Sequence, residues 1–275
     1  MSRLGIELLT VLGMPPIAHV RLAAELGCGH ISTALSGMPM RQLGVADWTM
    51  FPDWSLEGNR ALVGEMKAAM RDTGVRISLG EGFRVRQDGE VRDRAAGLDL
   101  MAELGAERIN AVSMEPDIGR TYDQLATLCE MVTERGMMFT IEFAPPNTIN
   151  SLASALAAID HIGHAKCRLL VDAMHFFRSG ATVAELAALD PNLIGYAQLC
   201  DAPMVSKGGT YMHEAMFARM VPGKGEFPLA DFVAALPTDL DIGLEVPNLA
   251  DTLADGSPKG VAARAVAGAR AILEL

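Results

Sequence analysis

Short apolar runs and longer amphipathic segments alternate along the whole of this chain. The runs in the second half of the chain are mostly apolar, which is typical of a parallel strand buried on both faces rather than a strand with one solvated face. Glycine, proline or polar residues follow the runs. The pattern predicts these strands: Leu4–Leu9, His30–Ala34, Arg76–Leu79, Arg108–Val112, Met138–Phe143, Arg168–Val171, Ile194–Leu199 and Asp241–Val246.

The amphipathic segments between the runs predict covering helices. A glycine follows several of them just before the next strand, at Gly27, Gly74, Gly105 and Gly136, and a glycine past the last turn adopts the left-handed conformation that ends a helix. The expected helices are Ile17–Leu26, Leu56–Thr73, Val91–Leu104, Tyr122–Arg135, Ser151–Ile162, Val183–Ala188, Leu229–Leu236 and Lys259–Leu273.

Regular alternation of strands and helices indicates the α/β class with a parallel sheet. Eight strand–helix units in 275 residues match the (β/α)₈ TIM barrel, which typically needs about 250 residues. No linker or change of composition divides the chain, so we predict one barrel domain over residues 1–275. An open doubly wound sheet is the alternative, but no glycine-rich phosphate-binding fingerprint follows the first strand.

The charge balance narrows the class of partner. The chain carries 23 Lys and Arg against 34 Asp and Glu, a net charge of −11. A nucleic-acid-binding surface concentrates Lys and Arg, and no such run is present. No segment approaches the roughly 18 uninterrupted apolar residues of a membrane span. We therefore expect a small-molecule substrate and neither a nucleic acid nor a membrane as partner.

The cysteines and the N-terminus bear on the cellular compartment. Four cysteines lie far apart without the spacing of a metal site, which is typical of small core residues in a reducing environment. Glu7 interrupts the apolar N-terminal run, and no small-residue cleavage site follows it. A cytoplasmic protein is expected.

Four of the expected strands end in residues able to bind a metal: Glu142, Asp172, Gln198 and Glu245. The first two separations fit one strand–helix unit of about 30 residues each, and the third leaves room for a long loop. Strand ends in a TIM barrel point their inward side chains at one central spot. Three carboxylates and an amide oxygen there would form a hard, oxygen-rich site, for which we expect Mn²⁺ or Mg²⁺ before Co²⁺ or Zn²⁺.

Two long connections follow strands at the same end of the barrel, where loops commonly carry function. Residues 36–55 include Trp48, Phe51 and Trp54, and residues 202–227 include Lys207 and Arg219. We predict that the three aromatic residues cover the pocket and contact an apolar part of the substrate. The alternative is a subunit contact, which would suit a homo-oligomer.

The strand ends together resemble the xylose-isomerase-like TIM barrels. The matching segments are Glu142, Asp172-Ala-Met-His175, Gln198-x-x-Asp201, Pro222-Gly-Lys-Gly225 and Leu244-Glu245. That family includes sugar and sugar-phosphate isomerases and epimerases, hydroxypyruvate isomerases, inosose dehydratases and dehydroshikimate dehydratases.

The resemblance implies that Glu142, Asp172, Gln198 and Glu245 are four metal ligands. It implies also that His175 supports those ligands and that Arg219 contacts the substrate. Gln198 stands where many ketose epimerases of the family have histidine, and Thr148 stands where they usually present another glutamate. Both departures weaken the case for a plain ketose 3-epimerase.

The expected chemistry is proton transfer beside a metal-bound carbonyl. An ion held by four protein oxygens leaves two octahedral positions for adjacent substrate oxygens, and the ion stabilises the enediolate formed when a proton leaves. Glu142 and Glu245, approaching from opposite sides, would remove and return that proton. We therefore predict a metal-dependent isomerase or epimerase acting on a 2-keto sugar or related hydroxyketone, with Lys207 and Glu81 as further substrate contacts.

Other interpretations stay open from sequence alone. A lyase or dehydratase would use the same enolate chemistry on a keto or partly apolar substrate. A non-catalytic barrel is disfavoured because facing buried carboxylates are costly without a function. Considered singly, His175 could be a core histidine and Gln198 a simple hydrogen-bonding residue, and Glu7 and Glu115 are expected to be ordinary polar residues of the barrel mouth.

Overall fold

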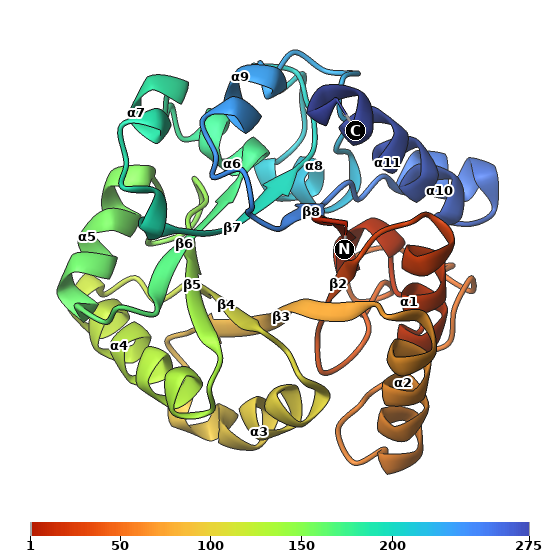
Figure 1. Cartoon of the computed structure of the whole chain (residues 1–275), viewed down its shortest axis with the longest axis horizontal. Coiled ribbons are helices and arrows are strands. Elements are labelled where there is room, and N and C mark those ends of the chain that lie inside the picture. The colour runs from red at the N-terminus through yellow and green to blue at the C-terminus, as the bar shows by residue number, and fades with distance from the viewer. Residues whose placement is uncertain (1, 275) are drawn as a thin grey trace.

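The computed structural model describes residues 2–274 and contains one closed barrel of eight parallel strands. Neighbours in sequence pair with each other, and β1 closes the barrel on β8. The predicted (β/α)₈ fold is confirmed (Figure 1). The strands are β1 Leu4–Ile6, β2 His30–Thr33, β3 Arg76–Val85, β4 Arg108–Ser113, β5 Met138–Glu142, β6 Cys167–Asp172, β7 Ile194–Leu199 and β8 Ile242–Leu244.

Helices surround the strands as an outer ring (Figure 1). They are α1 Pro16–Glu25, α2 Arg60–Thr73, α3 Ala95–Leu104, α4 Ile118–Glu134, α5 Leu152–Ile162, α6 Ala173–Arg178, α7 Val183–Ala187, α8 Tyr211–Phe217, α9 Leu229–Ala234, α10 Leu249–Asp255 and α11 Lys259–Leu273. Three 3₁₀ turns add η1 Leu8–Val11, η2 Val91–Arg94 and η3 Pro191–Leu193. Within residues 2–274, no helix has both the length and the apolar character needed to cross a bilayer.

Several element boundaries differ from the predicted ones for local reasons. The first strand stops at Ile6 because the chain turns into η1 after Glu7. Helix α2 begins at Arg60 because the Asn59 side chain accepts a hydrogen bond from the Leu62 amide and caps it. Strand β3 runs past its expected end to Val85, with a register shift before Phe83. Helices α6, α8 and α10 were not predicted.

A column of buried polar groups runs through the barrel interior. The Tyr196 hydroxyl donates to Glu7 Oε1 at 2.7 Å and lies 3.0 Å from Ser78 Oγ. Ser78 Oγ is 2.7 Å from His30 Nδ1, and His30 Nε2 is 3.7 Å from Asp241 at the opposite end of the barrel. All five residues are 0–8% exposed, so hydrogen bonds satisfy groups that would otherwise be costly to bury.

Lowering the pH should reduce the free energy of unfolding, because the folded protein buries neutral histidines. Burial lowers the pKa of His19 to about 4, whereas an unfolded histidine titrates near 6.5. Below that pH the unfolded chain takes up a proton that the folded protein excludes, so the contribution of His19 to stability falls as the pH drops from 6.5 toward 4. Between pH 7.5 and pH 5 the loss amounts to about 2 kcal/mol.

The matched variant is His19→Gln, which does not titrate and keeps a donor for the Ile6 carbonyl that lies 3.0 Å from His19 Nε2. Urea unfolding of the wild type and the variant at pH 7.5 and pH 5 measures the contribution of His19 alone, because the buried glutamates change the stability of both proteins equally. The stability of the wild type relative to the variant should decrease at pH 5. An unchanged difference would contradict this prediction.

Candidate active site

Six polar side chains converge at the C-terminal end of the barrel. Glu81 lies in the middle of its strand, and each of the others ends a strand, lies next to its end or directly follows it, as expected for a barrel mouth. The residues are Glu7 after β1, Glu81 in β3, Glu142 ending β5, Asp172 ending β6, Gln198 in β7 and Glu245 after β8. All are buried except Glu81, which is half-buried.

Gln198 lies at the centre of one half of this group. Its Nε2 is 3.2 Å from Glu7 Oε2, 3.2 Å from Glu245 Oε1 and 3.5 Å from Glu81 Oε1. Among the described His, Cys, Asp and Glu residues, these three glutamates are the one set in which one ligand atom from each residue lies within 4.8 Å of the others. The Oε1 of Gln198 is buried without a hydrogen-bond partner. The predicted ligand Gln198 is therefore central, but it contacts Glu7 and Glu81 as well as Glu245.

Glu7 can enter the barrel interior because its side chain lies over a glycine of β8, Gly243. A Cβ at Gly243 would overlap the Glu7 carboxylate. The sequence suggests only an ordinary mouth residue for Glu7, and it suggests the same for Glu115. Glu115 instead pairs with Arg120 at 2.9 Å, outside this group. Both glutamates follow an apolar run in the sequence, so that pattern alone does not tell which of them belongs to the site.

Arg219 connects the two halves of the group. Its Nη1 donates to Asp172 Oδ2 at 2.5 Å, and its Nη2 lies 2.8 Å from Glu245 Oε2. Arg219 is 1% exposed, and its Nε donates to the Ala215 carbonyl. Burial acts to raise the pKa of Asp172, but the Arg219 charge and the hydrogen bonds to Asp172 hold it below its usual value. Asp172 and Glu245 are thus joined through a guanidinium.

Glu142 lies in a separate hydrogen-bonded corner of the site. Asn110 Nδ2 donates to its Oε2 at 2.6 Å, and His175 Nε2 lies 3.4 Å from its Oε1. Tyr211 is 2.5 Å from His175 Nδ1. Burial and the nearby Asp172 charge raise the pKa of Glu142 to about 7. Burial also lowers the pKa of His175 to about 4, so the imidazole is neutral at pH 7 and Glu142 is suited to exchange a proton.

The structure brings the four predicted ligands into one region without forming a single cage. Among residues 2–274, Glu142, Asp172 and Glu245 are not a set whose oxygens all lie within 4.8 Å, because Arg219 separates Asp172 from Glu245. Asn110 and Tyr211, which hold Glu142 and His175, were missed because neither stands at a strand end that suggests a ligand.

The buried group carries an excess of negative charge. Burial raises the pKa of Glu81 and Glu245 well above the ordinary value, and neighbouring carboxylates add to both effects. Burial raises the pKa of Glu7 as well. Arg219 is the only buried lysine or arginine in the described part of the chain. Oxygen donors with surplus charge and an unpartnered amide oxygen on Gln198 fit a hard divalent cation.

The predicted aromatic contacts serve mainly to anchor the loop of residues 36–55. Trp48 is 5% exposed and packs in a small apolar cluster with Leu12, Met40 and Phe217, and Phe51 packs beside it. Trp54 Nε1 donates to the Gly13 carbonyl at 3.2 Å. The indole of Trp48 is covered by the protein's own apolar side chains, and the substrate contact expected of Trp48 stays a prediction.

Lys207 lies away from the carboxylates. Its side chain is 76% exposed, and its ammonium lies 3.8 Å from Glu226. The neighbouring Pro222–Gly225 turn is held instead by buried Asp201, which accepts hydrogen bonds from the Ala202, Gly223 and Phe227 amides. Nothing in this arrangement brings Lys207 to the buried group.

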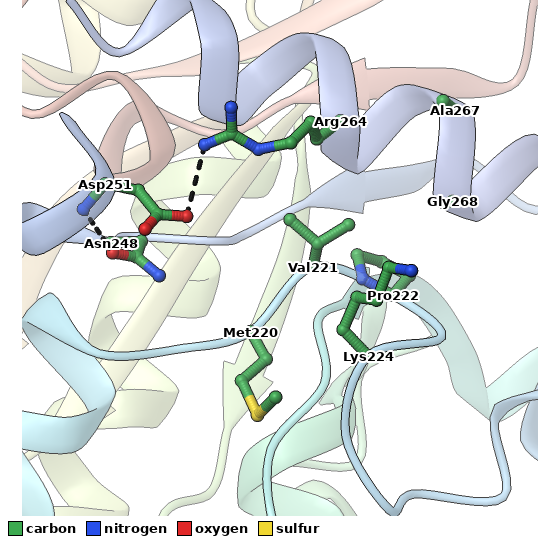
Figure 2. A pocket seen from close by; sticks show the side chains of 9 residues that line it. All are labelled: Met220, Val221, Pro222, Lys224, Asn248, Asp251, Arg264, Ala267 and Gly268. Atoms are coloured by element: carbon green, nitrogen blue, oxygen red, sulfur yellow. Dashed lines mark hydrogen bonds and ion pairs between the residues drawn. The ribbon is translucent and has the colours of Figure 1, made fainter. Parts of the chain in front are cut away.

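A cavity of about 540 Å³ lies beside this turn (Figure 2). Residues of the turn, α10 and α11 line it, and none of the predicted site residues does. Figure 2 shows Arg264 turned toward Asp251, with which it pairs at 3.1 Å. Of the two basic residues that line this cavity, Lys224 and Arg264, Arg264 is therefore already engaged.

Comparison with known proteins agrees with the geometry. A family model described as "Xylose isomerase-like TIM barrel" matches residues 20–267. A search of curated proteins found no significant match.

Solved structures extend the match over nearly the whole chain. The IolI protein with a bound zinc atom shares 14% identity at a TM-score of 0.79, covering 99% of this chain and 98% of that one. L-ribulose 3-epimerase shares 18% identity at a TM-score of 0.69, and the match covers 100% of this chain and 95% of that one. The probable 3-DHS dehydratase AsbF from Bacillus anthracis shares 14% identity at a TM-score of 0.68, and the match covers 94% of this chain and 97% of that one. At these identities the likeness establishes a common fold.

Proposed function

This chain belongs to the xylose isomerase-like TIM barrel family, and we propose that it is a divalent-metal-dependent isomerase or epimerase. The proposed substrate is a 2-keto sugar or a related hydroxyketone. The observation that carries the proposal is a group of four buried carboxylates and the half-buried Glu81 around Arg219, the one buried basic residue in the described part of the chain. Within this group the pKa of Glu142 is raised to about 7 by burial and by the Asp172 charge. Such displaced pKa values are typical of catalytic carboxylates.

Glu142, Asp172, Gln198 and Glu245 are the residues proposed to hold the ion. A divalent ion supplies Lewis-acid stabilisation of negative charge on substrate oxygens beside the carbon that loses its proton. The oxygen donors favour Mn²⁺ or Mg²⁺, and the zinc atom in the IolI structure keeps Zn²⁺, with Co²⁺, among the candidates.

The proton transfers are assigned to Glu142 and Glu245. Asn110 holds Glu142 Oε2 at 2.6 Å, which orients the other oxygen toward the site. Arg219 holds Glu245 Oε2 at 2.8 Å in the same way. Two carboxylates fixed on different strands can remove a proton on one side of a substrate carbon and return it on another. His175, Arg219 and Glu81 are the proposed substrate contacts from within this region.

A lyase or dehydratase is the second candidate, and Thr148 favours it. Ketose epimerases resembling this chain usually present a glutamate at that position. Here Thr148 Oγ1 donates to the Glu115 carbonyl at 2.5 Å, so the position supplies no acid to the site. The same initial proton removal, followed by loss of a β-substituent, would give an unsaturated product.

Proton exchange tests both candidates at their common first step. The metal-stripped protein is incubated in D₂O with ketoses, hydroxyketones and keto acids, with and without Mn²⁺ or Mg²⁺, and followed by NMR. We expect deuterium to appear at the carbon next to the carbonyl only when metal is present. Rearranged product would identify an isomerase or epimerase, and an alkene would identify a lyase. Absence of exchange across the set with metal-loaded protein would contradict the proposal.

A further inference from the structure

Strand β3 contains one extra residue relative to β4, its neighbour in the barrel (Figure 1). Between two register pairs, β3 has two residues, Glu81 and Gly82, where β4 has only Asn110. Gly82 has a φ of 90°, in the left-handed region that glycine adopts without strain. A bulge of this kind changes the direction of the side chains beyond it. The residues of β3 that follow Gly82 therefore point to the opposite face from the one they would take in a regular strand.

The bulge places Arg84 on the inner face of the barrel. Its two neighbours in the strand, Phe83 and Val85, are 2% and 1% exposed and belong to the main apolar core. Successive side chains of a strand point to opposite faces. Arg84 therefore points away from that core and toward the barrel mouth, where it is exposed to solvent.

Arg84 lies above the carboxylates of the candidate site. Its register partner is Val112, which is two residues, or about 7 Å of strand, beyond Asn110 on β4. Asn110 donates to Glu142 at 2.6 Å, so Arg84 lies about one layer of side chains above that carboxylate. Enough protein surrounds Arg84 for burial to lower its pKa, and the charges of Glu81 and Glu142 oppose this effect. The guanidinium is thus open to the mouth and within range of the carboxylate charges.

Two further arginines lie close to Arg84. Arg86 follows the end of β3, and Arg94 ends η2, which contacts β3; both charges act on Arg84. Within residues 2–274, the ion pairs engage other arginines, such as Arg120 with Glu90 at 2.9 Å, and none engages these three. Neighbouring guanidiniums without counter-charges repel each other, and an anion bound among them would relieve that repulsion.

We propose that Arg84, with Arg86 and Arg94, binds an anionic group at the end of the substrate remote from the reacting carbon. This inference rests on the proposed function and narrows its substrate to a hydroxyketone with a terminal carboxylate or phosphate. The N–H groups of a guanidinium match the oxygens of either anion in a two-pronged arrangement. The carboxylates deeper in the site repel an anion, so an anionic substrate needs such an anchor at the rim to enter with its hydroxyketone end first.

Three related sugars test the proposal by binding alone. D-fructose, D-fructose 6-phosphate and D-fructuronate share one hydroxyketone end and differ at the terminal carbon, which carries a hydroxyl, a phosphate or a carboxylate. Their binding to the Mg²⁺-loaded full chain is measured by calorimetry and by ligand-observed NMR, neither of which requires turnover. Arg84→Gln removes the charge, and Arg84→Lys keeps the charge but loses the two-pronged donor. Arg71→Gln is the matched control, because Arg71 is an exposed arginine in the last turn of α2, at the opposite end of the barrel.

We expect the wild type to bind one charged sugar at least about tenfold more tightly than D-fructose, the low end for charge-assisted hydrogen bonds. Preference for the phosphate or for the carboxylate identifies the anion. Arg84→Gln should bring the ratio close to one, Arg84→Lys should retain part of it and Arg71→Gln all of it. Circular dichroism checks folding, which an exposed arginine should affect little. Equal binding of the three sugars to the wild type would overturn the proposal, as would a preference that survives in Arg84→Gln.

The anion site and the proposed reaction fail in different ways. A charge preference that depends on Arg84, without proton exchange from any of the carbonyl compounds, would refute the reaction and leave the anion site standing. Metal-dependent proton exchange from neutral sugars, with equal binding of all three fructose derivatives, would refute the anion site and leave the reaction standing.

Discussion

Glu142→Gln is expected to lower turnover by about a thousandfold, within the range typical of a lost general base. Glutamine is close in size to glutamate and keeps a carbonyl oxygen for Asn110, whose Nδ2 lies 2.6 Å from Glu142 Oε2. It cannot accept the substrate proton, so binding of metal and substrate should change much less than the catalytic rate. The measurement is kcat for proton exchange or product formation, with Mn²⁺ content determined on the same preparation.

Glu115→Gln serves as the control for this substitution. Glu115 is also a buried glutamate that follows the end of a strand, but it pairs with Arg120 and contacts no carboxylate of the site. It should retain wild-type kcat. If Glu142→Gln holds metal and keeps more than a tenth of the wild-type rate, Glu142 is not the base.

Gly243→Ala is expected to displace Glu7 and destabilise the barrel by about 1–3 kcal/mol, the usual cost of overfilling a tight interior. The added methyl group would overlap the Glu7 carboxylate, which is 0% exposed and held by Tyr196. The carboxylate must then move away from Gln198, whose Nε2 lies 3.2 Å from Glu7 Oε2. Urea unfolding of the wild type and the variant measures the loss of stability.

A double mutant separates this clash from a general glycine effect. Glu7→Ala combined with Gly243→Ala removes the colliding carboxylate, so the Gly243→Ala penalty should largely disappear in that background. Gly64→Ala is the control, because Gly64 lies in helix α2 with no atom within 4 Å of the added Cβ, and alanine there should be neutral or stabilising. An equal penalty with and without Glu7 would show that the overlap is not the cause.

The local pattern of apolar and polar residues was sufficient to predict the barrel architecture. Buried parallel strands are mostly apolar, whereas the helices between them are apolar on one face only. The alternation of these two patterns along the chain therefore indicates which segments are strands and which are helices. Gly74 and Gly105 end α2 and α3 in the left-handed conformation, as predicted. The strand-end residues Glu142 and Asp172 could also be placed at the C-terminal face, because in a barrel every strand end lies there.

Which strand-end acids share a site was decided by tertiary structure. Glu7 and Glu115 follow apolar runs alike, yet Glu7 reaches Gln198 because Gly243 leaves room for it, while Glu115 pairs with Arg120. Arg219 joins Asp172 to Glu245 from a loop remote from both in sequence. Periodicity records whether a position is buried, whereas a site depends on distances between side chains on different strands. Those distances follow from strand register and close packing, which no local stretch of sequence encodes.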